Sequence, residues 1–161
     1  MPHDFDTLIA DNKQLTGLTP ELEHCLKDAA SIIVPQLNKV TDAFYIRLIT
    51  TPSTYKFLEN NTNQLDKLKA THLAWLTSLF VRDIDASFAK DMSHVGDVHL
   101  AIQLPIEFMS AAMSLMNKEL IRIVIDSLGD DKEQCLKVLQ AISAVTALTL
   151  VLMQKSYQLW T

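Results

Sequence analysis

Residues 94–109 place a histidine, His99, on the apolar face of a predicted helix. At 3.6 residues per turn, several large apolar side chains lie within about 60° of it around the helix axis: Phe88, Met92, Val95 and Ile102. A neutral imidazole among packed apolar groups needs a partner for its ring nitrogens. For a lone histidine that partner is more often a backbone carbonyl than a metal ion.

A second helical stripe also holds one histidine among large apolar side chains. Its members are Leu65, Leu68, His72, Trp75, Leu76 and Leu79. Two apolar helices that each present one inward imidazole can place the two rings on opposite sides of a flat cofactor, and haem has that shape. A structural zinc site fits less well, because it needs four ligands and neither cysteine has ligand spacing to a histidine.

The composition predicts one all-α domain. A chain of 161 residues with 48% hydrophobic content can bury a substantial core, and three glycines without an alternating β-branched run leave little room for a sheet. The net charge of −5 without a basic stripe argues against nucleic acid or anionic lipid as a direct partner. Two distant cysteines and an acidic N-terminus in place of a secretion signal predict a cytoplasmic protein.

Capping residues and helix breakers divide the chain into helices. Thr19 and Pro20 form a helix start, Pro35 separates two helices, and the asparagine-rich segment 60–63 is expected to cap the His72 helix. Pro105 opens a further helix. The expected helices lie within residues 1–18, from 20 to the proline at 35, at 36–49, around 55–58, from after 63 to about 81, and at 85–102, 106–128 and 132–160.

The segments around both histidines resemble the haem domain of the globin-coupled sensors. Residues 95–108 read V-G-x-V-H-x-x-I-x-L-P-x-x-F, residues 44–45 read F-Y, and residues 68–75 read L-x-x-T-H-L-x-W. Family members usually have R-I-G-L-P where this chain has A-I-Q-L-P at residues 101–105. The resemblance spans nearly the whole chain and implies a single globin domain over residues 1–161, with an extension helix within residues 1–18 and no or a minimal fourth helix.

The resemblance also implies roles for individual residues. His99 matches the proximal ligand of haem b, and His72 matches a minority of members in which an imidazole from this helix binds the iron on the distal side. Tyr45 and Thr71 match positions near bound gas. The residues expected to bury the haem are Phe44, Leu48, Leu65, Leu68, Val95, Val98, Ile102, Leu104 and Phe108.

These features together predict a sensor domain that is not itself an enzyme. It would detect a diatomic gas (O2, CO or NO) or the redox state of the iron, with displacement of His72 relayed to a C-terminal output domain that the given residues lack. No nucleophile motif or glycine-rich phosphate loop is present in the sequence. Two alternatives stay open: a globin-fold interaction module that binds no haem, and a haem protein that transfers electrons.

The last predicted helix is apolar on more than one face. Its apolar run over residues 138–153 is shorter than the roughly 20 residues of a membrane span. We therefore expect a homodimer through the last two helices, with Met109, Met113 and Met116 joining the interface. The alternative is that both faces of the last helix are buried within one monomer.

Overall fold

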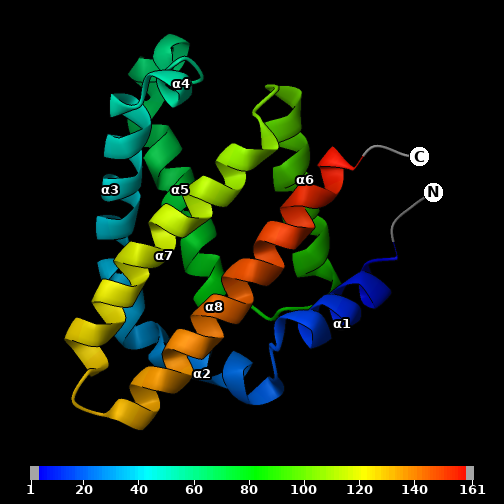
Figure 1. Ribbon diagram of the computed structural model, residues 1–161, viewed down its shortest axis with the longest axis vertical. Coiled ribbons are helices and arrows are strands. Elements are labelled where there is room, and N and C mark those ends of the chain that lie inside the picture. The colour runs from blue at the N-terminus through cyan, green and yellow to red at the C-terminus, as the bar shows by residue number, and fades with distance from the viewer. Residues whose placement is uncertain (1–3, 159–161) are drawn as a thin grey trace.

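The computed structural model describes residues 4–158, and the regular secondary structure within that range is all helical, with no β-strand (Figure 1). The predicted all-α architecture is therefore confirmed. In chain order the elements are α1 Phe5–Thr16, α2 Pro20–Ile33, the 3₁₀ helix η1 Val34–Gln36, α3 Leu37–Thr50, α4 Pro52–Tyr55, the 3₁₀ helix η2 Glu59–Gln64, α5 Leu65–Val81, α6 Ala86–Ala101, α7 Ile106–Leu128, α8 Lys132–Gln154 and the 3₁₀ helix η3 Lys155–Tyr157.

The helix starts are fixed by local capping. The Thr19 hydroxyl accepts a hydrogen bond from the backbone N–H of Leu22, and the carboxylates of Asp85 and Asp131 accept from N–H groups at the starts of α6 and α8. Each cap satisfies a backbone donor that has no partner within its helix. Because these signals are local, the predicted starts agree with the structure.

Three predicted boundaries are wrong. The short helix expected around 55–58 is α4, which covers Pro52–Tyr55. Residues 60–63 do not cap α5: they belong to η2, and the N-cap position of α5 is Gln64, which makes no side-chain capping bond. Asn61 has non-helical backbone angles that prevent a continuous α-helix through this segment. The α-helical part of the last helix ends at Gln154 and tightens into η3, and position 160 lies outside the described residues.

Helices α7 and α8 run antiparallel and lie side by side across the molecule, with α2 below them and α6 beside α8 (Figure 1). We call the end of the molecule where α4 lies, α5 begins, α6 ends and α7 begins the upper end. The lower end is where α2 lies, α7 ends and α8 begins. Buried side chains of α2, α7 and α8 belong to one hydrophobic core: Leu26, Leu120, Val124, Ile142 and Leu148.

The expectation for Met109, Met113 and Met116 is wrong. All three are buried inside the monomer, as is most of the apolar surface of α8, because α6 and α7 pack against that helix from different sides. The segment Lys132–Tyr157 has the length and hydropathy of a membrane span, but 56% of its most apolar window is buried in the domain. The apolar face of α8 is thus mainly core surface.

Candidate functional site

His99 lies near the end of α6 and is half-buried. Its Nδ1 is 2.7 Å from the backbone carbonyl oxygen of Val95, one helical turn earlier. A carbonyl oxygen only accepts, so Nδ1 carries the proton and donates, and the lone pair of the neutral ring is on Nε2. No described residue forms a hydrogen bond with that Nε2. This is the arrangement in which a histidine can ligate a metal while a backbone bond fixes its ring.

The apolar face of α6 passes from the core to the surface along the helix. Phe88 and Met92, near its start, are buried at 0% and 2% exposure. Val98 and Ile102, on either side of His99, are 51% and 52% exposed. The apolar pattern therefore continues beyond the part of the helix that the protein itself covers.

Helix α5 shows the same change in the opposite direction along the chain. Leu76 and Leu79 are buried, whereas Leu65, Leu68 and His72, nearer its start, are only half-buried. Helix α5 begins at the upper end of the molecule and α6 ends there (Figure 1). The uncovered parts of both helices therefore lie at the upper end. We name the half-buried and exposed apolar side chains there the apolar rim: Leu48, Phe57, Leu65, Leu68, Val98, Ile102, Leu104 and Phe108.

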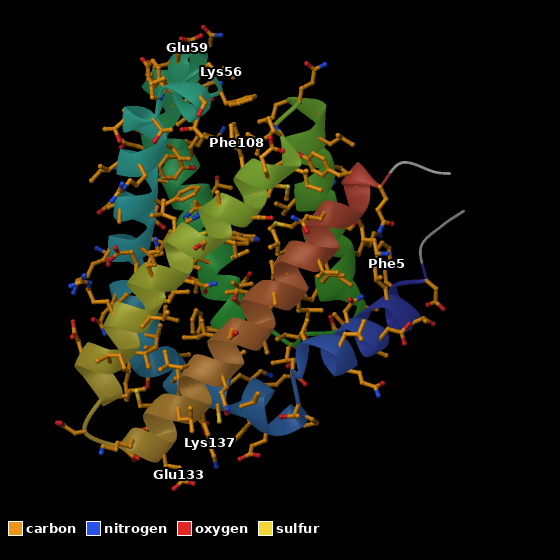
Figure 2. The ribbon with its side chains drawn as sticks, in the orientation of Figure 1. Phe5, Lys56, Glu59, Phe108, Glu133 and Lys137 are labelled. Atoms are coloured by element: carbon orange, nitrogen blue, oxygen red, sulfur yellow. The ribbon has the colours of Figure 1, made fainter. Side chains whose placement is uncertain are left out.

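Phe57 is the rim residue that sequence reasoning missed. Its ring packs edge-on against Phe108 with centroids 6.4 Å apart, and Phe108 lies at the upper end near Lys56 (Figure 2). The sequence does contain a signal for Phe57, because it is an aromatic residue in the short predicted segment around 55–58. The remaining predicted haem contacts, Phe44 and Val95, are partly buried and pack against the hydrophobic core, as does Leu104 of the rim.

His72 lies in an aromatic cluster formed by α3 and α5. Its ring stacks on Phe44 with centroids 4.5 Å apart and an interplanar angle of 10°. Tyr45 approaches it edge-on at 5.8 Å, and Trp75 lies tilted at 5.6 Å. Burial in this surrounding lowers the pKa of His72 to about 4, because the charged imidazolium would lose its hydration. The imidazole is therefore neutral at pH 7.

Both ring nitrogens of His72 have protein partners. Nδ1 lies 2.9 Å from the hydroxyl oxygen of Thr41, and Nε2 lies 3.1 Å from the sulfur of Met116. Sequence reasoning missed both residues. The spacing along α3 places Thr41 one turn before Tyr45, but nothing in the sequence pairs α7 with α5 at Met116.

The two predicted gas-contact hydroxyls have different surroundings. Tyr45 is buried, its hydroxyl donates to the carbonyl oxygen of Leu68 at 3.3 Å, and burial raises the pKa of the phenol. Thr71 is exposed, and its hydroxyl donates to the carbonyl oxygen of Lys67 at 3.0 Å. The structure therefore brings Tyr45 to His72 and leaves Thr71 at the surface.

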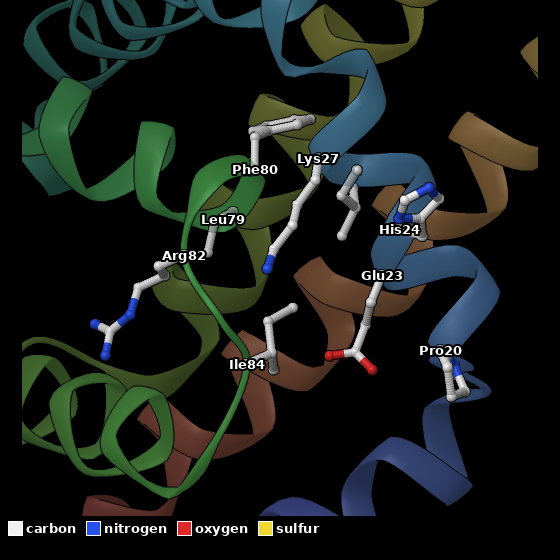
Figure 3. A pocket seen from close by; sticks show the side chains of 9 residues that line it. Pro20, Glu23, His24, Lys27, Leu79, Phe80, Arg82 and Ile84 are labelled. Atoms are coloured by element: carbon white, nitrogen blue, oxygen red, sulfur yellow. The ribbon is translucent and has the colours of Figure 1, made fainter.

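A surface pocket of about 230 Å³ lies between α2 and the end of α5, away from both histidines that the sequence singled out (Figure 3). Its lining includes Glu23, Lys27 and Arg82. Lys27 pairs with Asp83, and Arg82 donates to Asp91 at 2.7 Å. These charges are neutralised within the chain, so the pocket offers no set of convergent free groups.

The end of α8 and η3 are fastened to α6 and to the α6–α7 corner. A Cβ atom added to Gly96 would lie 2.0 Å from the carbonyl oxygen of Met153, so the two helix backbones are in direct contact there. The Ser156 hydroxyl donates to the carboxylate of Asp97, and the Tyr157 hydroxyl donates to the carbonyl oxygen of Leu104 at 2.8 Å. These contacts lie on both sides of His99 in the sequence.

Comparison with known proteins gives the fold a family. The chain is similar to the globin domain of the Geobacter sulfurreducens globin-coupled sensor, with 25% identity over 92% of this chain and 97% of that chain and a TM-score of 0.86. It is also similar to the globin domain of E. coli DosC. The ferric form has 18% sequence identity, covers 92% of this chain and 99% of that chain, and has a TM-score of 0.77. The ferrous form has 20% sequence identity, covers 89% of this chain and 97% of that chain, and has a TM-score of 0.75.

No curated protein sequence matches the chain. The predicted globin fold is confirmed by the structural matches, and the four-residue α4 agrees with the expected minimal fourth helix. The Protoglobin family model matches residues 5–159, which is nearly the entire described structure. On this match and this fold, the chain belongs to the protoglobin family.

Proposed function

We propose that this protein is a haem-based sensor domain that binds haem b, with His99 as the proximal ligand. The observation that carries the proposal is the state of His99: Nδ1 is fixed by the Val95 carbonyl, and Nε2 has no hydrogen-bonding partner among the described residues. The surrounding apolar rim supplies the surface that a porphyrin would cover. When bound, haem supplies an iron centre that takes up a diatomic gas or changes redox state.

The apolar side chains of the rim are better covered by a porphyrin than left in contact with water. Val98 and Ile102 precede and follow His99 in the sequence, and both are more than half exposed. A porphyrin against these side chains would remove apolar surface from water, at about 25 cal/mol per Å². The other members of the rim near the predicted haem site are half-buried: Leu48, Leu65, Leu68, Leu104 and Phe108. Phe44 of α3 stacks on His72.

We assign His72 as the distal ligand in the resting state. It is neutral, as a ligating imidazole must be, and it lies on the helix that supplies Leu65 and Leu68 to the rim. Ligation requires that His72 leave Met116, because its Nε2 faces that sulfur in the structure. We propose Tyr45 and Thr71 as the hydroxyls that hydrogen-bond a gas molecule; the proximity of Tyr45 to His72 supports its role, and Thr71 would have to leave the Lys67 carbonyl to reach the gas.

Displacement of His72, on α5, would be felt at His99, the proposed proximal ligand on α6. From α6 it would be relayed to the end of α8. The backbone contact of Gly96 with Met153 and the bonds of Ser156 and Tyr157 link α6 and the α6–α7 corner to the C-terminal segment. A shift of α6 therefore moves that segment. We propose that this motion reaches an output domain, as the name of the Geobacter globin-coupled sensor suggests for that protein.

A cytoplasmic homodimer through the outer faces of α7 and α8 completes the proposal. Ile121 and Ile125, one turn apart on α7, and Leu136 on α8 are 48%, 48% and 56% exposed. They replace the three buried methionines as the apolar groups available to a second copy.

Absorption spectroscopy of the ferric and ferrous protein tests the haem assignment. We expect low-spin six-coordinate bands that become five-coordinate in His72→Ala, and loss of haem retention in His99→Ala. His94→Ala is the matched control, since His94 lies on the same helix but is exposed. Unchanged bands in His72→Ala would remove His72 from the iron, and a protein without a Soret band would instead be the interaction module that binds no haem.

A further inference from the structure

Thr41 differs from four other helical threonines in what its hydroxyl bonds. On their helices Thr50, Thr71, Thr146 and Thr149 each donate to a backbone carbonyl four residues earlier. Thr41 is 2% exposed, and among the described residues its hydroxyl oxygen has one hydrogen-bonding partner, Nδ1 of His72. A buried hydroxyl proton needs an acceptor. The Thr41 hydroxyl therefore donates to Nδ1.

This bond fixes the tautomer of His72. With its lone pair at Nδ1 accepting from Thr41, the neutral ring carries its proton on Nε2. Nε2 then donates to the Met116 sulfur at 3.1 Å, which is a weak acceptor. Stacking on Phe44 fixes the plane of the ring. In this position neither nitrogen of His72 presents a lone pair to a metal.

We propose that Thr41 and Met116 form a docking position that His72 occupies whenever it is off the iron. The inference rests on the proposed function, since it takes His72 as the distal ligand. In this inference His72 has two defined positions, one on the iron and one bonded to Thr41 and Met116, and it alternates between them. The two states require opposite tautomers: Nε2–H in the docking position and an Nε2 lone pair on the iron.

The docking position sets how easily a gas displaces His72. A free imidazole in an apolar interior without partners is costly, so a site that satisfies both nitrogens stabilises the displaced state. Removing the Thr41 hydroxyl should shift the balance toward ligated His72. One neutral hydrogen bond corresponds to about a 3- to 10-fold change in such an equilibrium.

The test uses the haem-loaded protein with CO as the probe. Thr41→Val removes the hydroxyl while keeping a β-branched side chain of similar shape, and Thr41→Ser keeps the hydroxyl as the matched control. Met116→Leu removes the sulfur acceptor. We expect Thr41→Val to lower the apparent CO affinity of the ferrous protein about 3- to 10-fold and to raise its six-coordinate fraction, with Thr41→Ser close to the wild type and Met116→Leu intermediate.

A second readout does not depend on affinity. The ferrous CO complex is diamagnetic, so ¹⁵N NMR of its histidines reports which nitrogen of the displaced His72 carries the proton. We expect the Nε2–H tautomer in the wild type and in Thr41→Ser, and its loss or mixing in Thr41→Val.

The outcomes separate this inference from the proposed function. If the wild type retains no haem, the proposed function is overturned together with this inference; if it retains haem but shows no six-coordinate state that depends on His72, the distal assignment and the docking position are overturned while His99 ligation stands. If that state is present but Thr41→Val and Thr41→Ser have equal CO affinities, or the displaced His72 carries its proton on Nδ1, the docking position alone is overturned.

Discussion

The two ends of the molecule differ in how completely their apolar side chains are covered. At the lower end, Leu120, Val124 and Ile142 of α7 and α8 are packed among other helices and excluded from water. At the upper end, Val98 of α6 and Ile102, its C-cap residue, are more than half exposed. Ile121, Ile125 and Leu136 are similarly exposed at the lower end, on the outer faces of α7 and α8, whereas Val98 and Ile102 are exposed next to His99. A protein retains such a surface where something else covers it.

The largest expected contrast is in the energetic cost of truncating a leucine at each end. Leu120→Ala should lower the free energy of unfolding by about 3 kcal/mol, because it leaves a cavity among packed side chains. Leu68→Ala, at a half-buried rim position, should cost about 1 kcal/mol or less in haem-free protein. Urea unfolding followed by circular dichroism measures both. Equal losses would mean that the upper end is packed as tightly as the lower one.

The architecture could be predicted because its determinants are local. Thr19, Asp85 and Pro105 mark helix starts through their own backbone chemistry, and the apolar spacing around His99 identifies the face of α6. The Nδ1 bond of His99 to Val95 is also local, since the two residues are one turn apart. The haem role of either histidine is still a prediction.

Contacts between distant segments could not be predicted in this way. Whether Met116 faces a second copy or the interior depends on how α7 packs against α3, α5 and α8, which the periodicity of α7 alone does not encode. Its contact with His72 is a consequence of the same packing. Thr71 was assigned by motif position, and only the structure shows that its side chain is exposed.

The next expected effect concerns pH and the environment of His72 in haem-free protein. The ordinary pKa of this group is 6.5, and burial lowers it to about 4 in the folded state. Between these values the unfolded chain binds a proton that the folded protein does not, so stability falls as the pH drops below 6.5 and levels off below 4. From pH 7 to pH 5 the loss attributable to His72 is about 2 kcal/mol.

Unfolding of the wild type and His72→Gln at both pH values isolates this contribution, because glutamine keeps polar atoms but does not titrate in this range. The side chains that face His72 are Thr41, Phe44, Tyr45, Trp75 and Met116, and none of them is charged at these pH values. His94→Gln, at an exposed position, is the control and should leave the pH dependence unchanged. A His72→Gln variant with the same pH dependence as the wild type would place His72 in contact with water.

The smallest expected effect concerns the corner between α6 and α7 at the upper end. Gln103 has a φ of 59°, the left-handed conformation that suits glycine, and this is the position where the globin-coupled sensors that the chain resembles usually have one. A side chain in this conformation costs about 1 kcal/mol, which glycine relieves at some cost in unfolded-chain entropy. Gln103→Gly should therefore stabilise the protein by about 0.5 kcal/mol in urea unfolding. Gln140→Gly, at an exposed position inside α8, is the matched control and should destabilise it by about 1 kcal/mol. If both substitutions destabilise equally, the Gln103 side chain makes contacts at the upper end that outweigh its backbone strain.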